Sequence, residues 1–203
     1  MAGLLVIPAR PDRADGEDED AGLPTRPPAD APPPRLGHYV LLDKLGEGGM
    51  GVVVAAFHAE LESHVAIKVL NGAWSGHNFV ARRFKAEARI ASTIGHPNIV
   101  DVTDFGRTED ASAYLVMEFL PGTSLRRRME AGLSMAQAVA LCRQLAAVLA
   151  QVHQKGVIHR DLKPRNIFLA RHEQNGKVTQ SAKVIDFGVS KIPRAADKAT
   201  RDL

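Results

Sequence analysis

The sequence contains a single cysteine, Cys142, among 203 residues, so it has no internal disulfide and gives no reason to expect an oxidising compartment. Long apolar runs are also missing, because residues 139–152 are interrupted by arginine and glutamine and fall short of the ~20 apolar residues of a membrane span. The apolar patch near the N-terminus has no basic residue before it and a proline directly after it, which argues against a secretion signal. We therefore expect a cytoplasmic protein without a membrane segment.

A strong excess of one charge is missing as well. The formal net charge is +3, and residues 1–36 carry four arginines against seven acidic residues, so the rest of the chain is mildly basic. A mildly basic domain suits a phosphate-containing ligand. This balance is too common among proteins to indicate nucleic-acid binding, and we expect none.

Residues 1–36 differ in composition from the rest of the chain. They contain an acidic run at 15–20 and repeated prolines at 24–34, and their low hydrophobicity does not offset the entropy lost on ordering. We expect a disordered or extended leader. The prolines could dock in an aromatic groove of a partner, but a solvated tail is favoured because no fuller recognition pattern accompanies them. Residues 37–203 are expected to form one domain.

Two polar motifs in the second half of the chain indicate phosphoryl-transfer chemistry. They are His-Arg-Asp-Leu-Lys-Pro-Arg-Asn at 159–166 and Asp-Phe-Gly at 186–188. Phosphoryl transfer from a nucleotide needs a carboxylate to take the hydroxyl proton and oxygen ligands to hold Mg²⁺ on the phosphates. Asp161 could be that base, while Asn166 and Asp186 are hard oxygen donors of the kind that Mg²⁺ prefers.

A glycine-rich segment, Gly-Glu-Gly-Gly-Met-Gly at 46–51, lies between two expected strands at 39–45 and 52–57. Glycine permits backbone N–H groups to approach phosphate oxygens closely, where a Cβ would obstruct them. Dinucleotide-binding folds use the same glycine spacing, but in those folds a helix follows the glycines. Here three valines at 52–54 favour a strand.

Lys68 ends an apolar strand pattern, Val-Ala-Ile-Lys at 65–68. A charged lysine in such a strand would cost several kcal/mol if it were buried without a partner, so it needs an anion. A phosphate and a carboxylate are the obvious candidates. The alternative is a lysine that points to solvent from an edge strand, which would be favoured if the other motifs were absent.

Glu87 is a carboxylate that we expect on an inward face, where an acid usually has a partner. A helix at about 78–93 would place Glu87 on the same inward stripe as Phe84 and Ala91. An intrahelical ion pair between Glu87 and Arg83, one turn earlier, is the competing interpretation.

The remaining pattern predicts two further strands, a long helix and a hairpin. The helix begins at Ser134, where Ser134 and Gln137 form a capping box, and runs to Gly156. Cys142 falls within its pattern, and we expect a buried thiol. The strands are expected at 99–105, 113–119, 167–170 and 183–185, the last two joined across an Asn-Gly turn at 175–176.

Together these motifs resemble the serine/threonine protein kinase family in its bacterial form. The family patterns G-x-G-x-x-G-x-V, V-A-I-K, H-R-D-L-x-x-x-N and D-F-G are matched in that order, and the match is continuous from about Gly37. The resemblance implies an α+β, two-lobed protein-kinase-like fold, with an antiparallel-sheet upper lobe at about 37–117 and an incomplete helical lower lobe at about 121–203. The lower lobe is expected to be incomplete because no A-P-E motif follows Gly188. A partner could then cover the apolar surface left on the long helix.

The resemblance also implies ATP and Mg²⁺ as cofactors and a protein carrying a Ser or Thr hydroxyl as substrate. Asp161 would orient and deprotonate that hydroxyl, and Lys163 would neutralise charge on the transferred group. Asn166 and Asp186 would bind Mg²⁺, and Lys68, held by Glu87, would grip the phosphates. The other expected nucleotide contacts are Leu45, Gly46, Glu47, Gly48 and Gly51 in the glycine segment, Val53, Ala66 and Phe168 around the adenine, and Met117, Glu118 and Leu120 in the hinge.

Four further residues receive roles from the resemblance. His159 is expected to be structural rather than a base, and Arg160 is expected to contact a phosphorylated activation loop, for which Ser190 and Thr200 are candidate phosphosites. Three hypotheses remain for the chain as a whole: a fragment of an active kinase, a nucleotide-binding but catalytically incompetent binding module, and a degraded gene without a folded product. The presence of every catalytic residue favours the first.

Overall fold

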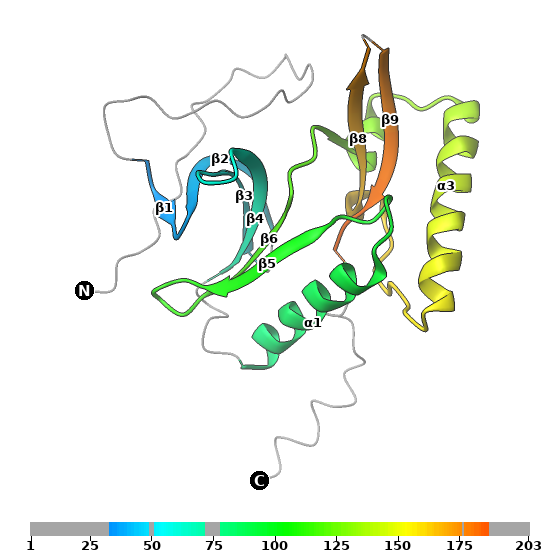
Figure 1. The fold of residues 1–203 in the computed structure, drawn as a ribbon. Coiled ribbons are helices and arrows are strands. Elements are labelled where there is room, and N and C mark those ends of the chain that lie inside the picture. Colours follow the sequence, from blue (N-terminus) through cyan, green and yellow to red (C-terminus); the bar gives the residue numbers. More distant parts are fainter. Residues whose placement is uncertain (1–32, 49–50, 72–77, 176, 187–203) are drawn as a thin grey trace.

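The structure, a computed structural model, describes residues 33–48, 51–71, 78–175 and 177–186 (Figure 1). Its first part is a sheet with one helix. The elements of this upper lobe are β1 (Arg35–Leu36), β2 (Tyr39–Gly48), β3 (Gly51–His58), β4 (Ser63–Leu70), α1 (Asn78–Ile94), β5 (Val102–Arg107) and β6 (Ala113–Glu118). The sheet order is β1-β2-β3-β4-β6-β5, and every neighbouring pair is antiparallel, as predicted.

The second part is smaller and is joined to the sheet after β6. Its elements are β7 (Gly122–Ser124), α2 (Leu125–Glu130), α3 (Met135–Gln154), a short 3₁₀ helix (Pro164–Asn166), β8 (Ile167–Gln174) and β9 (Lys177–Val184). β7, β8 and β9 form a second antiparallel sheet, against which α3 lies (Figure 1). The predicted hairpin is confirmed and is longer than expected, since its ladder extends to the pair Gln174 and Lys177. The elements β7 and α2 were not predicted.

Two of the apolar clusters in the upper lobe show how it is held together. One fills the sheet around Leu41, Val54, Ile67 and Val116, all of which are fully buried. The other lies between the sheet and α1 and includes Phe84. At about 25 cal/mol per Å² of apolar surface removed from water, burial of this kind is the main stabilising contribution to the lobe.

The predicted boundary of the leader is wrong at its C-terminal end. Arg35 and Leu36 form β1 and pair with Val40 and Tyr39, and Leu36 is only 8% exposed in the sheet cluster. The N–H of Leu41 donates to the carbonyl of Pro34 at 2.8 Å. An apolar side chain next to an exposed sheet edge is enough to order these last residues. Residues 1–32 lie outside the described part of the chain.

The strand expected at 99–105 is also only partly correct. Regular pairing with the upper sheet begins at Val102, while Ile99 forms a parallel bridge with Val184 at the end of β9. The N–H of Val184 donates to the carbonyl of Asn98 at 2.8 Å, and the N–H of Val100 donates to the carbonyl of Val184 at 3.0 Å. The segment after α1 is thus hydrogen-bonded to β9 of the lower lobe before the chain continues into β5 of the upper sheet.

The predicted helix at 134–156 is confirmed as α3, including the capping box formed by Ser134 and Gln137. Its inner face packs through Val148 and Val152, and its outer face is open: Met135 is 80% exposed and Val139 is exposed. Cys142 is exposed too, contrary to prediction, because it lies on this outer face. By length and composition alone α3 could cross a membrane, which is weak evidence for a span.

Candidate active site

The glycine segment forms the end of the β2–β3 hairpin. An added Cβ at Gly46 or Gly48 would meet no other described atom within 4 Å, and neither glycine has a positive φ. Gly51 is different, since its Cβ would lie 2.0 Å from the carbonyl oxygen of Val69. Packing therefore requires glycine at 51 but not at 46 or 48, where the approach of a ligand remains as a reason for it.

The side chains next to these glycines lie at the surface. Leu45 is exposed, and Glu47 forms an ion pair with Lys44. The hydrogen bond and the charge of Lys44 lower the pKa of the Glu47 carboxyl. Residues 49–50 lie outside the described part of the chain.

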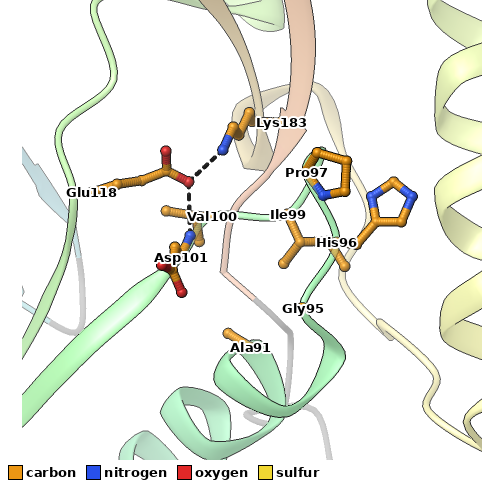
Figure 2. A pocket seen from close by; sticks show the side chains of 9 residues that line it. All are labelled: Ala91, Gly95, His96, Pro97, Ile99, Val100, Asp101, Glu118 and Lys183. Carbon is orange, nitrogen blue, oxygen red and sulfur yellow. Dashed lines mark hydrogen bonds and ion pairs between the residues drawn. The ribbon is translucent and has the colours of Figure 1, made fainter.

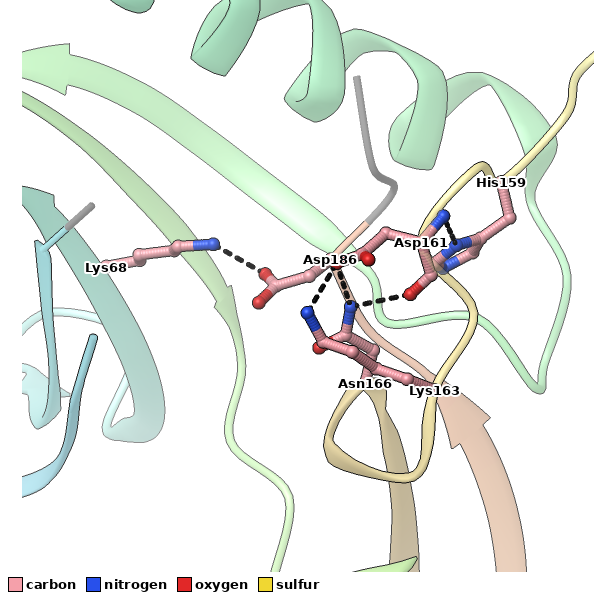
Figure 3. A network of polar contacts seen from close by, with 6 residues as sticks. All are labelled: Lys68, His159, Asp161, Lys163, Asn166 and Asp186. Carbon is pink, nitrogen blue, oxygen red and sulfur yellow. Dashed lines mark hydrogen bonds and ion pairs between the residues drawn. The ribbon is translucent and has the colours of Figure 1, made fainter. Parts of the chain in front are cut away.

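Lys68 lies on β4, paired with Val53 of β3, and its ammonium group points toward Asp186 of the lower lobe. Nζ of Lys68 is 2.6 Å from Oδ1 of Asp186 and 5.9 Å from the ring centre of Phe84 (Figure 3). A carboxylate from the lower lobe, that of Asp186, thus lies beside Lys68, while the predicted pairing of Lys68 with Glu87 stays a prediction. Glu87 lies on α1, and its side chain is outside the described part of the structure.

The loop before β8 brings three of the predicted catalytic residues together (Figure 3). Oδ2 of Asp161 accepts hydrogen bonds from Nζ of Lys163 at 2.6 Å and from Nδ2 of Asn166 at 3.1 Å. Nδ2 of Asn166 also donates to the Asp161 carbonyl at 2.9 Å. The side chain of Asp161 is 13% exposed, and these hydrogen bonds hold its carboxylate in one orientation.

Asn166 directly precedes β8, and Asp186 lies two residues after the end of β9. Because Ile167 pairs with Val184, Asn166 lies opposite Ile185, and the N–H of Ile185 donates to the Asn166 carbonyl at 2.9 Å. Asp186 is the next residue, so the antiparallel register places both predicted metal ligands at the same end of the hairpin.

The backbone at this site adopts unusual conformations. Asp186 has φ 55° and Arg160 has φ 64°, in the left-handed region that non-glycine residues rarely adopt. Each such residue costs on the order of 1–3 kcal/mol and persists only where the surrounding contacts hold it. The bonds that Asn98 and Val100 make to β9 provide this support just before Asp186.

His159 is a buried residue that contacts the loop containing Asp161. It is 2% exposed, and its Nδ1 accepts the N–H of Asp161 at 3.3 Å. Burial lowers the pKa of the imidazole, while a hydrogen bond to the backbone of Ile185 opposes this shift. A neutral, buried ring that contacts both Asp161 and Ile185 fits the expected structural role. The candidate phosphosites Ser190 and Thr200 lie outside the described residues.

The segment between the lobes carries the predicted hinge contacts. Met117 pairs with Ala66 across the sheet, and Phe168 pairs with Ser124 at the start of β8. The N–H of Glu118 donates to the carbonyl of Asp101 at 3.0 Å. Leu120 lies in the connection between β6 and β7 and is half-buried.

The Glu118 side chain points toward Lys183 and Asp101. Its Oε1 accepts hydrogen bonds from Nζ of Lys183 at 2.5 Å and from the N–H of Asp101 at 2.8 Å (Figure 2). These groups line a cavity of about 340 Å³ behind the hinge. Of the predicted nucleotide contacts only Glu118 lines it, so this cavity is distinct from the predicted nucleotide site.

The donor groups fit a magnesium ion that is shared with a phosphate ligand. The side-chain nitrogen of Asn166 donates hydrogen bonds to Asp161, which leaves the side-chain oxygen of Asn166 available as a metal ligand. The Asp186 side chain is 40% exposed. Among the described residues, no three His, Cys, Asp or Glu side chains are grouped to hold a metal ion by themselves. Mg²⁺ is commonly bound in this way, by one or two protein oxygens together with substrate phosphates and water.

Comparison with known proteins identifies the family. The sequence profile of the protein kinase domain matches residues 39–202. The chain belongs to the protein kinase family. Serine/threonine-protein kinase Pkn1 of Myxococcus xanthus is 40% identical over 161 residues, which cover 79% of this kinase chain and 23% of that protein. Serine/threonine-protein kinase PrkC of Bacillus subtilis is 39% identical over 156 residues, covering 76% of this chain and 23% of that protein.

Solved kinase structures agree with this assignment. A crystal structure of the Mycobacterium tuberculosis PknI kinase domain has a TM-score of 0.66 at 26% identity and covers 84% of this chain and 68% of that one. A double mutant of the same domain has a TM-score of 0.65 at 28% identity, with 79% and 62% covered. The chain spans about a quarter of the length of its curated relatives and about two thirds of these kinase-domain chains.

Sequence reasoning missed several residues of this kinase site. The side-chain amide of Asn98 donates a hydrogen bond to the carbonyl oxygen of Ala182 at 2.7 Å and stabilises β9. The ammonium group of Lys183 donates to the carboxylate of Glu118. A break at Gly95-His96-Pro97-Asn98 was visible in the sequence, but the partner of this segment lies more than 80 residues later. Local patterns carry no information on such a pairing.

Proposed function

We propose that this kinase chain binds Mg²⁺-ATP between its two lobes and transfers the γ-phosphoryl group to Ser or Thr hydroxyls of a protein. The observation that carries the proposal is a pair of neighbouring ion pairs: Lys68 with Asp186, which joins the two lobes, and Lys163 with Asp161 in the lower lobe (Figure 3). Together they combine cationic phosphate-binding groups, a metal ligand and a candidate base.

The contacts of these residues support the following roles. Asp161 would accept the proton of the substrate hydroxyl while the hydroxyl oxygen bonds to the γ-phosphorus and the bond to the ADP leaving group breaks. Lys163, bonded to the same carboxylate, would stabilise the negative charge on the transferred group. Mg²⁺, bound by Asn166 and Asp186, would neutralise the phosphates. Lys68 would exchange part of its contact with Asp186 for phosphate oxygens.

The adenine would lie between the upper sheet and β8. Val53 and Ala66 would cover one face of the ring and Phe168 the other, with backbone groups of Glu118 and Leu120 at its edge and Met117 behind it. Leu45, Gly46, Glu47, Gly48 and Gly51 would enclose the phosphates, and Glu87 would hold Lys68. The open space at Gly46 and Gly48 supports this arrangement. We place the domain in the cytoplasm, where ATP is available.

A second candidate function is a nucleotide-binding module that transfers no phosphoryl group by itself. The exposed outer face of α3 favours this alternative, because Met135, Val139 and Cys142 lie open there. A protein segment that covers this face, from the same polypeptide or from a partner, would then be needed to complete the lower lobe.

The test is Mg²⁺-ATP binding and autophosphorylation of the purified chain, with Asp161→Asn as a matched control. Labelled Ser or Thr in the wild type and none in the variant would support transfer. Nucleotide binding by both proteins without labelling would support the binding module. A folded chain that does neither would overturn both proposals.

A further inference from the structure

Two helices end side by side at the junction between the lobes. α1 ends at Ile94, followed by Gly95 with φ 57°, and α3 ends at Gln154, followed by Lys155 and by Gly156 with φ 72°. The last carbonyls of a helix carry a partial negative charge. α1 has no basic residue in its last turn and α3 has only His153, so the helices themselves place little positive charge between these two negative ends.

Lys155 supplies that charge. Its Nζ is 2.6 Å from the carbonyl oxygen of Ile94 and 3.5 Å from that of Thr93, both in the last turn of α1. The backbone N–H of the same residue donates to the carbonyls of Gln151 and Val152 in α3. One residue of the lower lobe therefore caps the carboxyl end of its own helix and that of the upper-lobe helix.

The position of Lys155 is fixed by the way α3 ends. The N–H of Gly156 donates to the carbonyl of His153 at 2.9 Å, and that of Val157 donates to the carbonyl of Val152 at 3.1 Å. The side chains of Val157 and Val152 also pack in the same apolar cluster. These features make up a Schellman-type helix end, which holds the backbone of Lys155 in one orientation.

An apolar contact accompanies the lysine but does not replace it. Ala91 and Ile94 of α1 pack on Val148 and Val152 of α3. Apolar packing is largely non-directional, whereas a charge-assisted hydrogen bond has a preferred distance and angle. The lysine is thus a directional contact between the end of α1 itself and the lower lobe, in addition to the hydrogen bonds that Asn98 and Val100 make to β9 after the helix.

We propose that Lys155 is a positioning residue that couples the lower lobe to α1 and thereby to the nucleotide site. α1 carries Phe84, whose ring lies beneath Nζ of Lys68, and Lys68 contacts Asp186. On the other side, the chain reaches Asp161 six residues after Lys155. The effect on nucleotide binding rests on the proposed function, whereas the effect on α1 does not.

The first experiment measures amide hydrogen exchange of the full chain without nucleotide. In Lys155→Met, the amides at the carboxyl end of α1 should exchange about tenfold faster or more, while those of β2, β3 and β4 should not change. Lys155→Arg retains a charged donor and should restore the wild-type rate. Arg143→Met, which removes an exposed charge from α3, should behave like the wild type. Lys155→Gln serves as a second variant if Lys155→Met is not folded.

The second experiment measures the Kd for Mg²⁺-ATP in the same proteins. Lys155→Met should raise it at least about fivefold, and Lys155→Arg should restore it. Unchanged exchange in α1, or a change no larger than in Arg143→Met, would overturn the tether. Faster exchange with an unchanged Kd would overturn its coupling to the site. A wild-type chain that binds no nucleotide would instead overturn the proposed function, and the exchange result would still decide whether the tether exists.

Discussion

Two glycines of one motif should respond in opposite ways to the same substitution. In Gly51→Ala the new Cβ would meet the carbonyl oxygen of Val69 at 2.0 Å and its carbonyl carbon at 2.9 Å. Both atoms belong to the backbone of β4, so the strands must separate by on the order of 1 Å to restore ordinary contact. Overpacking of this kind costs about 1–3 kcal/mol, and more where backbone resists the shift.

At Gly48 the same methyl group enters open space, and the backbone angles are accessible to alanine. Gly48→Ala should leave the free energy of unfolding unchanged or raise it by about 0.5 kcal/mol, because alanine loses less backbone entropy on folding. It should still weaken Mg²⁺-ATP binding, since the Cβ would occupy the path of a phosphate oxygen toward the backbone N–H groups.

Urea unfolding followed by circular dichroism measures the first effect, and titration with a fluorescent ATP analogue measures the second. The expected pattern is loss of stability in Gly51→Ala and loss of nucleotide affinity at full stability in Gly48→Ala. A Gly48→Ala protein with wild-type affinity would refute the role given to this glycine. A Gly51→Ala protein with wild-type stability would refute the packing argument.

Three further tests of the lower lobe use urea unfolding. Val148→Ala, in the buried face of α3, should cost roughly 2 kcal/mol, whereas Val139→Ala on the exposed face of the same helix should change stability by less than about 0.5 kcal/mol; equal costs would contradict the observed packing of α3. Ser134→Ala removes the capping box and should cost about 1 kcal/mol, and an unchanged midpoint would show that the cap contributes nothing. Burial lowers the pKa of His159 from its ordinary 6.5, so below about pH 6.5 the unfolded state binds more protons than the folded state, and stability falls on acidification. His159→Asn should therefore lose less stability than the wild type between about pH 7.5 and pH 5.5, and an equal or larger loss would refute this assignment.

The parts of this site that could be predicted from the sequence consist of residues that lie close together in the chain. Asp161, Lys163 and Asn166 lie within six residues, and their hydrogen bonds follow from one turn of a loop. The β2–β3 hairpin follows from the apolar strand patterns on either side of a glycine turn, and the long helix from its capping box. In each case the residues that interact are close enough in sequence for a local pattern to contain them.

The contacts that the sequence did not predict join distant segments. Neither the bonds of Asn98 to β9 nor that of Lys155 to Ile94 has a local signature, because each depends on how two finished elements pack. Cys142 was misplaced for a different reason. α3 is rich in alanine, leucine and valine on several sides, so its periodicity does not reveal which face is covered.

The contact between Lys68 and Asp186 joins residues 118 positions apart, and this separation bears on the order in which the molecule can assemble. Strands β1 to β4 pair with their neighbours in sequence, so this part of the sheet can form early and with little loop-closure entropy. Asp186 follows the last strand of the second sheet. During synthesis the glycine hairpin and the strand that carries Lys68 would therefore be folded before the ribosome has added Asp186. The contact between Lys68 and Asp186 would form only when β9 packs in place.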